Sequence, residues 1–181
     1  MPYTFQSEQW LPYLPAVVFS FFANPDNLPR LMPRWQRARI ERANLVPAPP
    51  PPSFPTPLPG IAAGSGTRLL LSFRAFPLSP FRIPWHAEIS EFVWNDHFCD
   101  IQLRGPFKSW KHCHRIRPEA RSTNPVAKPV TGTLLTDHVT YDLPLGPLGT
   151  LANLLFVRRQ LASTFRYRHR RTLDLLSRSA G

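Results

Sequence analysis

The sequence lacks a long apolar run, a set of cysteines and a balance between the two signs of charge. Its most apolar stretch, residues 14–23, is interrupted by Pro15 and is about half as long as a membrane-spanning helix. Cys99 and Cys113 are too few for a disulfide framework or a metal set of the CxxC type. The first residues have neither the basic start nor the apolar core of a secretory signal. We therefore expect a cytoplasmic protein without stable membrane insertion, in which both cysteines are reduced.

The sequence also lacks the short motifs of common catalytic and nucleotide-binding sites. GxGxxG, the Walker loop, GxSxG and HExxH are all absent. Residues 60–66 are rich in glycine, but they follow a proline-rich segment and do not open a helix, so they do not favour a phosphate site. We expect no cofactor.

Acidic residues are scarce, with 11 Asp and Glu against 22 Lys and Arg and a formal net charge of +11. Such an excess suits nucleic acids, acidic membranes or anionic ligands, but it can equally serve solubility alone, because net charge specifies no site. The end of the chain has a single acid, Asp174, beside Arg158, Arg159, Arg166, Arg168, Arg170, Arg171 and Arg178. An acidic protein or an anionic surface could bind there. Nucleic acid is disfavoured, since no recognised nucleic-acid-binding fold accompanies these arginines.

Apolar side chains and prolines are abundant. The hydrophobic fraction is 43% and the charged fraction 18% over 181 residues, which suits one globular domain spanning residues 1–181. Eight of the 23 prolines lie in residues 47–59. Prolines cannot donate ladder hydrogen bonds, so this segment is expected to be an extended loop within the domain. A role as an SH3 ligand is less favoured, because both flanks resemble strands of one sheet.

Hydrophobic periodicity predicts a strand, two short helices, six more strands and one long helix. The first strand covers residues 3–8, and the short helices occupy residues 12–22 and the segment between a capped turn at 24–29 and Pro33. The later strands are expected at residues 36–46, 67–76, 82–93, 97–104, 109–117 and 132–143, and the long helix at 146–177.

Strands that follow one another without crossover helices should be antiparallel neighbours, and such a sheet needs one face covered. We therefore predict an α+β helix-grip fold, in which a curved, antiparallel seven-stranded sheet wraps around the long C-terminal helix. That helix is expected to bury Leu151, Leu155, Leu161 and Phe165 against the sheet. Space left between the sheet and the helix is the expected ligand cavity.

Alternation along the strands predicts which side chains face that space. In residues 109–117 one alternate set of side chains includes Lys111, Arg115 and Arg117, and this charged set belongs in water. The other set therefore points inward: Trp110, His112, His114 and Ile116. In residues 132–143 the bulkier parity, which includes Asp137 and Tyr141, is chosen over the alternative that contains His138. In residues 82–93 the inner stripe contains Trp85, Ala87 and Ile89.

A turn centred on Pro106 would pair residues whose numbers sum to 212. Phe98 then opposes His114, Asp100 opposes His112, Gln102 opposes Trp110, and Cys99 opposes Cys113 on the outer face. The opposed cysteines could form a strained cross-strand disulfide under oxidising conditions, but cytosolic conditions disfavour it. The candidate acid–base residues are therefore Asp100, His112, His114 and Asp137. The candidate ligand-binding residues are Trp85, Phe98, Gln102, Phe107, Trp110, His112, His114, Tyr141 and Phe165.

Several interpretations of the polar cluster stay open. It could be a self-satisfied network that fixes the sheet, it could meet the polar end of a ligand, or it could act as acid and base. His112 and His114 also suggest a metal, with Asp100 or Asp137 as a third ligand. We expect no metal ion, because hydrogen bonds between neutral histidines and the neighbouring carboxylates account for this grouping without one.

The order of elements resembles the START-like (SRPBCC) superfamily, which includes polyketide cyclase/dehydrase-like and lipid-transfer proteins. An uncharacterised bacterial subgroup is similar in several segments, at residues 27–33, 98–100, 105–114, 137–144 and 165–169. The resemblance implies a helix-grip fold over most of the chain. Cyclase and aromatase relatives act on polyketides tethered to a carrier protein, but the long proline-rich loop departs from them and the Asp/His cluster does not match their catalytic residues.

Three functions follow from these observations. The favoured one is binding of a largely apolar small molecule, lipid-like, aromatic or polyketide-like, in the internal cavity. The first alternative is an enzyme of the cyclase or dehydratase type that uses the Asp/His cluster for proton transfer. The second alternative is an interaction module that uses the basic surface of the last helix.

Overall fold

The computed structural model describes residues 2–51, 61–122 and 128–179. Its strands are β1 (Tyr3–Leu11), β2 (Arg39–Asn44), β3 (Arg68–Phe73), β4 (Ile83–Val93), β5 (His97–Arg104), β6 (Ser109–Arg121) and β7 (Val130–Asp142). Its helices are α1 (Pro15–Ala23), η1 (Pro25–Asn27), α2 (Leu28–Leu31), η2 (Arg34–Gln36), α3 (Pro147–Ala152), the π-helical η3 (Asn153–Val157) and α4 (Arg158–Ser179).

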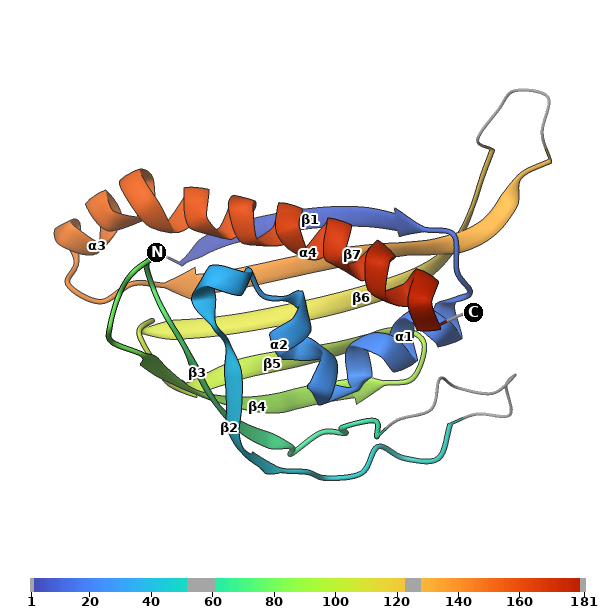
Figure 1. The fold of residues 1–181 in the computed structure, drawn as a ribbon, viewed down its shortest axis with the longest axis horizontal. Helices are drawn as coiled ribbons and strands as arrows, with labels where there is room; N and C mark the ends of the chain where they lie inside the picture. The colour runs from blue at the N-terminus through green and yellow to red at the C-terminus, as the bar shows by residue number, and fades with distance from the viewer. Residues whose placement is uncertain (1, 52–60, 123–127, 180–181) are drawn as a thin grey trace.

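All seven strands form one antiparallel sheet in the order β1-β7-β6-β5-β4-β3-β2. The long α4 lies across one face of the sheet, and α1 and α2 lie on the same side (Figure 1). This arrangement is the predicted helix-grip fold, with the two short helices placed after the first strand as expected. Among the described residues, no helix is both long and apolar enough to cross a membrane.

Irregularities in the ladders help the sheet to bend around the helix. The β4–β5 register shifts between His86 and Ala87 and again between Ile89 and Glu91. Such bulges increase the local twist of a strand. Strand β6 runs past its predicted end and includes Pro118, which opposes Thr133 of β7. The β5 partner has ended by then, so this part of β6 has a free edge on which a missing N–H is tolerated.

The proline-rich loop is described only at its two ends. Pro47 forms an isolated antiparallel bridge with Ala63, and the Trp94 indole donates to the Pro49 carbonyl at 2.7 Å. Residues 52–60 lie outside the described residues, so the predicted extended conformation remains a prediction for most of the loop.

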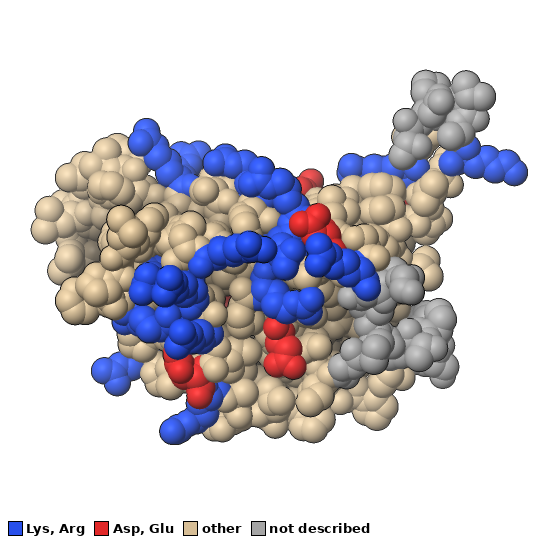
Figure 2. All heavy atoms as spheres, viewed as in Figure 1, with Lys and Arg blue, Asp and Glu red and all other residues tan. Residues whose placement is uncertain are grey.

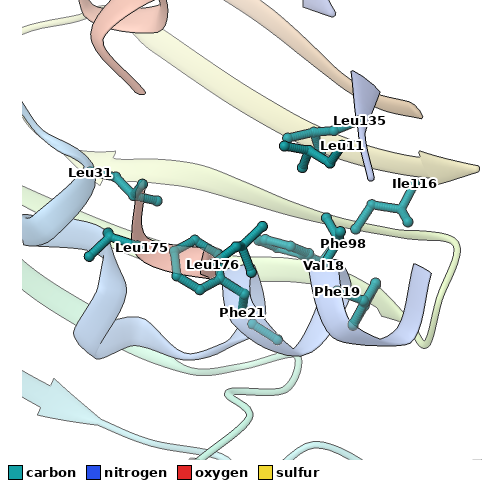
Figure 3. Packing of buried hydrophobic residues seen from close by; sticks show 11 residues of the cluster. Leu11, Val18, Phe19, Phe21, Leu31, Phe98, Ile116, Leu135, Leu175 and Leu176 are labelled. Atoms are coloured by element: carbon teal, nitrogen blue, oxygen red, sulfur yellow. The ribbon is translucent and has the colours of Figure 1, made fainter. Parts of the chain in front are cut away.

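One end of the space between sheet and helices is filled by a hydrophobic cluster. Figure 3 shows side chains from α1, α2 and the end of α4 gathered over the ends of the strands. Val18 and Phe19 of α1 are 0% exposed, and Leu175 and Leu176 of α4 are 1% exposed. Helix α1 is apolar on nearly all sides because it is buried on nearly all sides. The first core cluster consists of Leu11, Val18, Phe19, Phe21, Ala23, Leu31, Phe98, Ile116, Leu135, Leu175 and Leu176.

The other end holds a smaller second core cluster of Val139, Tyr141, Leu161 and Phe165. Leu161 and Phe165 are buried as predicted, but Leu151 and Leu155 are exposed, which corrects the expected helix face. The reason is the π-helical turn η3, because its wider turn shifts the phase of the preceding residues relative to α4. Asn153 is buried in their place, where its Oδ1 accepts from the Tyr141 hydroxyl at 2.6 Å.

The two cysteines correct a second expectation. They are opposed across the β5–β6 hairpin, as the predicted register requires. However, they form a disulfide rather than remaining reduced. Their Cα atoms are 4.1 Å apart and both side chains leave the same face of the sheet, so the sulfur atoms are within bonding reach.

Candidate functional site

A pocket of about 380 Å³ lies between the sheet and the helices. Strands β3 to β6 form one wall, while the end of α1, η1, α2, η2, η3 and α4 supply the other. Three large rings contact one another on the sheet side: Trp85 packs edge-to-face on Trp110 at 5.1 Å, and Phe107 lies 4.9 Å from Trp110. Phe76 and Phe156 also line the pocket and are each 62% exposed, so the pocket reaches the molecular surface beside them.

The pocket receives most of the residues that alternation predicted. The predicted residues that line it are Trp85, Phe98, Asp100, Phe107, Trp110, His112, His114 and Phe165. Gln102, Tyr141 and Asp137 do not line it. The Gln102 amide instead donates to the Phe107 carbonyl at 2.8 Å, and the Tyr141 ring lies 5.7 Å from Phe107. Both side chains thus support a ring of the pocket wall.

The polar cluster is assembled across three neighbouring strands. Asp100 opposes His112 in the β5–β6 register, and His114 opposes Asp137 in the β6–β7 register. His112 Nε2 lies 2.9 Å from Asp137 Oδ1, and its Nδ1 lies 3.5 Å from Asp100 Oδ1. His114 Nδ1 approaches the same Asp137 oxygen at 2.7 Å, but outside the angles of a hydrogen bond. The cluster is therefore continuous, and one carboxylate oxygen serves two imidazole rings.

Aromatic side chains also pack against the rings of these two histidines. His114 stacks on Phe98 at a centroid distance of 4.5 Å and lies 5.3 Å from Phe22. His112 contacts the Phe165 ring edge-on at 5.6 Å. His112, His114 and Asp137 are all buried, while Asp100 is partly exposed. The cluster consequently meets the pocket through its imidazole rings and Asp100, with Asp137 behind them.

Their surroundings drive the two imidazole pKa values apart. Burial disfavours a charge on His112, but the hydrogen bonds and negative charges of Asp100 and Asp137 outweigh burial and raise its pKa. Burial, together with the neighbouring His112, lowers the pKa of His114 to about 4. Burial opposes ionisation of Asp137, yet the two histidines hold its pKa well below the usual range. The cluster therefore favours protonation of His112 relative to an ordinary histidine, and it keeps His114 neutral and Asp137 ionised at neutral pH.

This arrangement could serve several chemical purposes. Two imidazoles in one pocket wall, one with a raised and one with a lowered pKa, can act as acid and base, or orient a polar group. Asp100, His112 and His114 also offer ligand atoms that all lie within 4.8 Å of one another, so these three could hold a metal ion. Both nitrogens of His112 already face carboxylates, however, and a metal would have to displace Asp100 from His112 Nδ1.

The arginines of α4 do not all lie on one solvated face. Arg158, Arg159, Arg166, Arg170 and Arg178 are exposed, as expected. Arg168 instead lines the pocket, where its guanidinium lies 5.0 Å from the centroid of the Phe165 ring. Its charge also lowers the pKa of Asp137 and His114. Sequence reasoning missed this residue, although its spacing of three from Phe165 was a usable signal.

Residues of the short helices were also missed. Leu31, Met32, Gln36 and Ala38 line the pocket, and α2 contacts α4. Nothing in the local pattern of residues 28–38 predicts on which part of the sheet they lie, because that depends on contacts with a helix more than 120 residues away.

Comparison with known proteins identifies the fold. No protein-family model matches the chain, and no curated protein sequence does. Among solved structures, TTHA0849 from Thermus thermophilus superposes with a TM-score of 0.62 at 16% identity, over 96% of this chain and 99% of that one. CV1439 from Chromobacterium violaceum gives 0.63 at 13% identity, over 96% of each chain.

A norcoclaurine synthase from Thalictrum flavum, a point mutant in complex with a transition state analogue, is also similar. It has a TM-score of 0.60 at 12% identity, and the match covers 100% of this chain and 98% of the synthase. Identities this low bear on the fold and not on the chemistry. The chain therefore has the helix-grip fold of these structures.

Proposed function

We propose that the chain binds a largely apolar small molecule, lipid-like, aromatic or polyketide-like, between the sheet and α4. The observation that carries the proposal is the pocket of about 380 Å³ lined mainly by aliphatic and aromatic side chains. Pockets of about 300–1,000 Å³ with a few convergent polar groups are typical small-molecule sites. The ligand complex of the norcoclaurine synthase supports the proposal by analogy of fold.

The residues that line the pocket suggest which part of a ligand each wall would contact. Trp85, Phe107 and Trp110 would contact the apolar body, because their rings form a continuous wall. His112 and His114 would meet a polar group, since their rings line the pocket while Asp137 holds them from behind. Phe98 and Phe165 would then cover the two sides of that polar contact.

Native mass spectrometry of freshly purified protein tests the proposal, because a bound ligand adds its mass to that of the chain. The matched variant is Ala87→Phe, since Ala87 is buried and lines the pocket. A ring at this position should fill the pocket and displace the ligand. Ala43→Phe is the control, because Ala43 is an exposed residue of β2 outside the pocket. Equal ligand occupancy in both variants, with both still folded by circular dichroism, would contradict the proposal.

A second candidate function is an enzyme of the cyclase or dehydratase type, in which the Asp/His cluster transfers a proton. The observation that favours it is the pair of pocket-lining imidazoles with pKa values shifted in opposite directions. His114, kept neutral, would be the base, and His112, with its raised pKa, the acid.

The base can be tested with 5-nitrobenzisoxazole, a small apolar probe. Removal of its ring C–H proton by a base breaks the N–O bond and releases a coloured nitrophenolate. We expect release to be faster than in buffer and to be lost in His114→Ala. His138→Ala is the control, because His138 is exposed on the opposite face of β7. If both variants behave like the unmodified chain, the enzyme hypothesis is wrong.

A further inference from the structure

A second, smaller pocket of about 210 Å³ lies where η2 and α2 meet α4. Its lining consists of Pro29, Arg30, Met32, Pro33, Arg34, Arg37, Ala38, Tyr167 and Arg171. Four of these side chains are arginines, and among the described residues that line the pocket there is no Asp or Glu. In Figure 2, blue side chains gather along α4 and over the short helices beside it, with few red ones among them.

The positive charge of this pocket is largely uncompensated. Arg30 donates from Nη1 to the neutral Asn27 Oδ1 at 2.7 Å, and Arg171 Nη1 is 3.8 Å from Asp174 Oδ2. Within the described part of the chain, neither Arg34 nor Arg37 has a carboxylate within 4.0 Å. Guanidinium groups that converge without an acid form a site for oxygen anions, which they bind through paired N–H donors.

The backbone that carries these arginines is held in place. Arg37 ends η2 in the left-handed conformation with φ of 47°, and its carbonyl accepts from Arg82 Nη2 at 2.7 Å. The same Arg82 donates from Nη2 to the Ser72 carbonyl of β3 at 2.8 Å. The position of η2 is thus tied to the sheet, so that Arg34 and Arg37 project from a fixed segment rather than a loose loop.

The second pocket adjoins the main pocket. Met32 and Ala38 line both, so the two pockets border each other at these two side chains. On α4, Arg168 lines the main pocket and Arg171 lines the second, three residues further along the helix. A molecule with its apolar body in the main pocket would reach these arginines by passing the shared border at Met32 and Ala38.

We propose that the second pocket binds the anionic head group, a phosphate or a carboxylate, of an amphiphile whose apolar body occupies the main pocket. This inference rests on the proposed binding function and narrows its ligand class. Neither the apolar lining of the main pocket nor its histidines requires a charged ligand, whereas four arginines at its border do favour one.

The experiment compares three probes of equal chain length, decyl phosphate, decanoate and decanol, with inorganic phosphate as a fourth. A change in tryptophan fluorescence reports entry of the decyl chain, because two of the five tryptophans, Trp85 and Trp110, line the main pocket. Calorimetry reports binding of inorganic phosphate. The variant is Arg34→Gln/Arg171→Gln, and its matched control is Arg166→Gln/Arg170→Gln, which removes the same charge from exposed positions of α4 outside both pockets.

We expect the unmodified chain and the control to bind decyl phosphate and decanoate about tenfold or more tightly than decanol. In Arg34→Gln/Arg171→Gln this advantage should disappear, while decanol affinity stays unchanged. An advantage that survives in this variant, or falls equally in the control, would overturn the inference. Decanol that binds none of the three proteins would overturn the proposed function. A loss of inorganic phosphate binding confined to Arg34→Gln/Arg171→Gln would then still support an anion site.

Vesicles distinguish the source of the head group. Phosphatidylcholine vesicles with and without phosphatidic acid are pelleted with each protein. Association that requires phosphatidic acid and is lost only in Arg34→Gln/Arg171→Gln would assign the head group to a membrane lipid. Binding of decyl phosphate without any vesicle association would assign it to a free amphiphile.

Discussion

The two ends of the space under α4 are built from the same kinds of side chains but are filled differently. At the end covered by α1, Phe19, Leu175 and Ile116 are 0–1% exposed and pack in one cluster. At the end covered by α3 and η3, rings of comparable size leave a pocket, and Leu148 and Leu154 remain 66% exposed. Strand β6 crosses both ends, with Trp110 in the pocket wall and Ile116 in the first core cluster.

The difference arises from the covering elements rather than from the sheet. Alternation places large side chains inward along the whole of β6. At the filled end, α1, α2 and the end of α4 send a second layer of bulky side chains down onto them, and this layer fills the space. The π-helical η3 turns its leucines away from the sheet and presents Asn153 to it. The pocket thus lies where the covering elements leave open the space that they fill at the other end.

The largest expected change in stability comes from removing one buried ring at each end, which compares the packing of the two ends directly. Phe19→Ala removes a ring from the filled end and should lower the free energy of unfolding by about 3–5 kcal/mol. Phe165→Ala should cost about 3 kcal/mol, at the lower limit of that range, because one side of its ring already faces the pocket. Denaturant titrations of both variants provide the measurement. A greater loss for Phe165→Ala would mean that the pocket end is the more tightly packed one.

The disulfide provides the next test, since it ties the two strands that serve both ends. Replacing Cys99 and Cys113 by Ser opens a closed loop with a sequence separation of 14. For a loop of about this length, the constraint on the unfolded chain is worth about 3 kcal/mol. Denaturation with and without dithiothreitol measures it, and the reductant should not affect the double Ser variant. Hydrogen exchange should rise more at Trp110 than at Ile116, because the pocket end has less packing behind it.

His114, which lies between the two ends, should make the free energy of unfolding fall as the pH is lowered. The pKa of His114 is lowered to about 4 by burial and the neighbouring His112, whereas an unfolded histidine takes up its proton near pH 6.5. Protonation therefore favours the unfolded chain as pH falls from about 6.5 to 4, with a loss approaching 3 kcal/mol. His112, whose pKa is raised, contributes stability below pH 6.5 that is lost as pH rises through its folded pKa.

The variant that isolates this effect is His114→Phe, which keeps a ring against Phe98 and Phe22. Its free energy of unfolding, measured by urea titration between pH 4 and 7, should fall much less toward acid than that of the unmodified chain. His169 also has a lowered pKa and titrates in both proteins, so only the difference between the two curves is attributed to His114. Parallel curves would contradict the assignment.

The smallest expected effect concerns the π-helical turn. Tyr141→Phe removes the hydroxyl that donates to Asn153 and leaves a buried amide oxygen without a partner, at a cost of about 1–2 kcal/mol. Tyr3→Phe is the matched control, because the Tyr3 hydroxyl donates to Thr150 at an exposed site. Its loss should be below about 0.5 kcal/mol. Thermal melts of the two variants compare these costs directly, and equal shifts would show that Asn153 does not anchor η3.

Much of the sheet could be predicted from the sequence because strands obey a strict period of two. Pro106 marked the centre of the β5–β6 hairpin, and the pairs Phe98–His114 and Asp100–His112 followed from symmetry. In β7 the bulkier of the two alternate sets of side chains was predicted to point inward, and this choice placed Asp137 beside the histidines. The roles assigned to these residues stay predictions.

The helix was harder to predict because its period is not constant. A uniform rotation of 100° per residue would turn Leu154 toward the same side as Leu161, whereas the π turn brings Asn153 there and leaves Leu151, Leu154 and Leu155 exposed. The second pocket was not predicted at all. It joins Arg30, Arg34 and Arg37 to Arg171, and a contact across such a separation leaves no local pattern. The register predicted that Cys99 and Cys113 are opposed and could be joined, but their redox state was assigned from the expected compartment, and that assignment was wrong.

The position of the disulfide in the ladder has a mechanical consequence for the site. The Cys99–Cys113 pair lies directly between the pairs Phe98–His114 and Asp100–His112, on the opposite face of the same two strands. Sliding β5 along β6 by one residue would turn Cys99 or Ile101 toward the pocket in place of Asp100, and the covalent bond blocks that movement. The disulfide lies on the outer face of the sheet and fixes the register of β5 on β6. It thereby keeps Phe98 and Asp100 aligned with His114 and His112 whether or not the pocket is occupied.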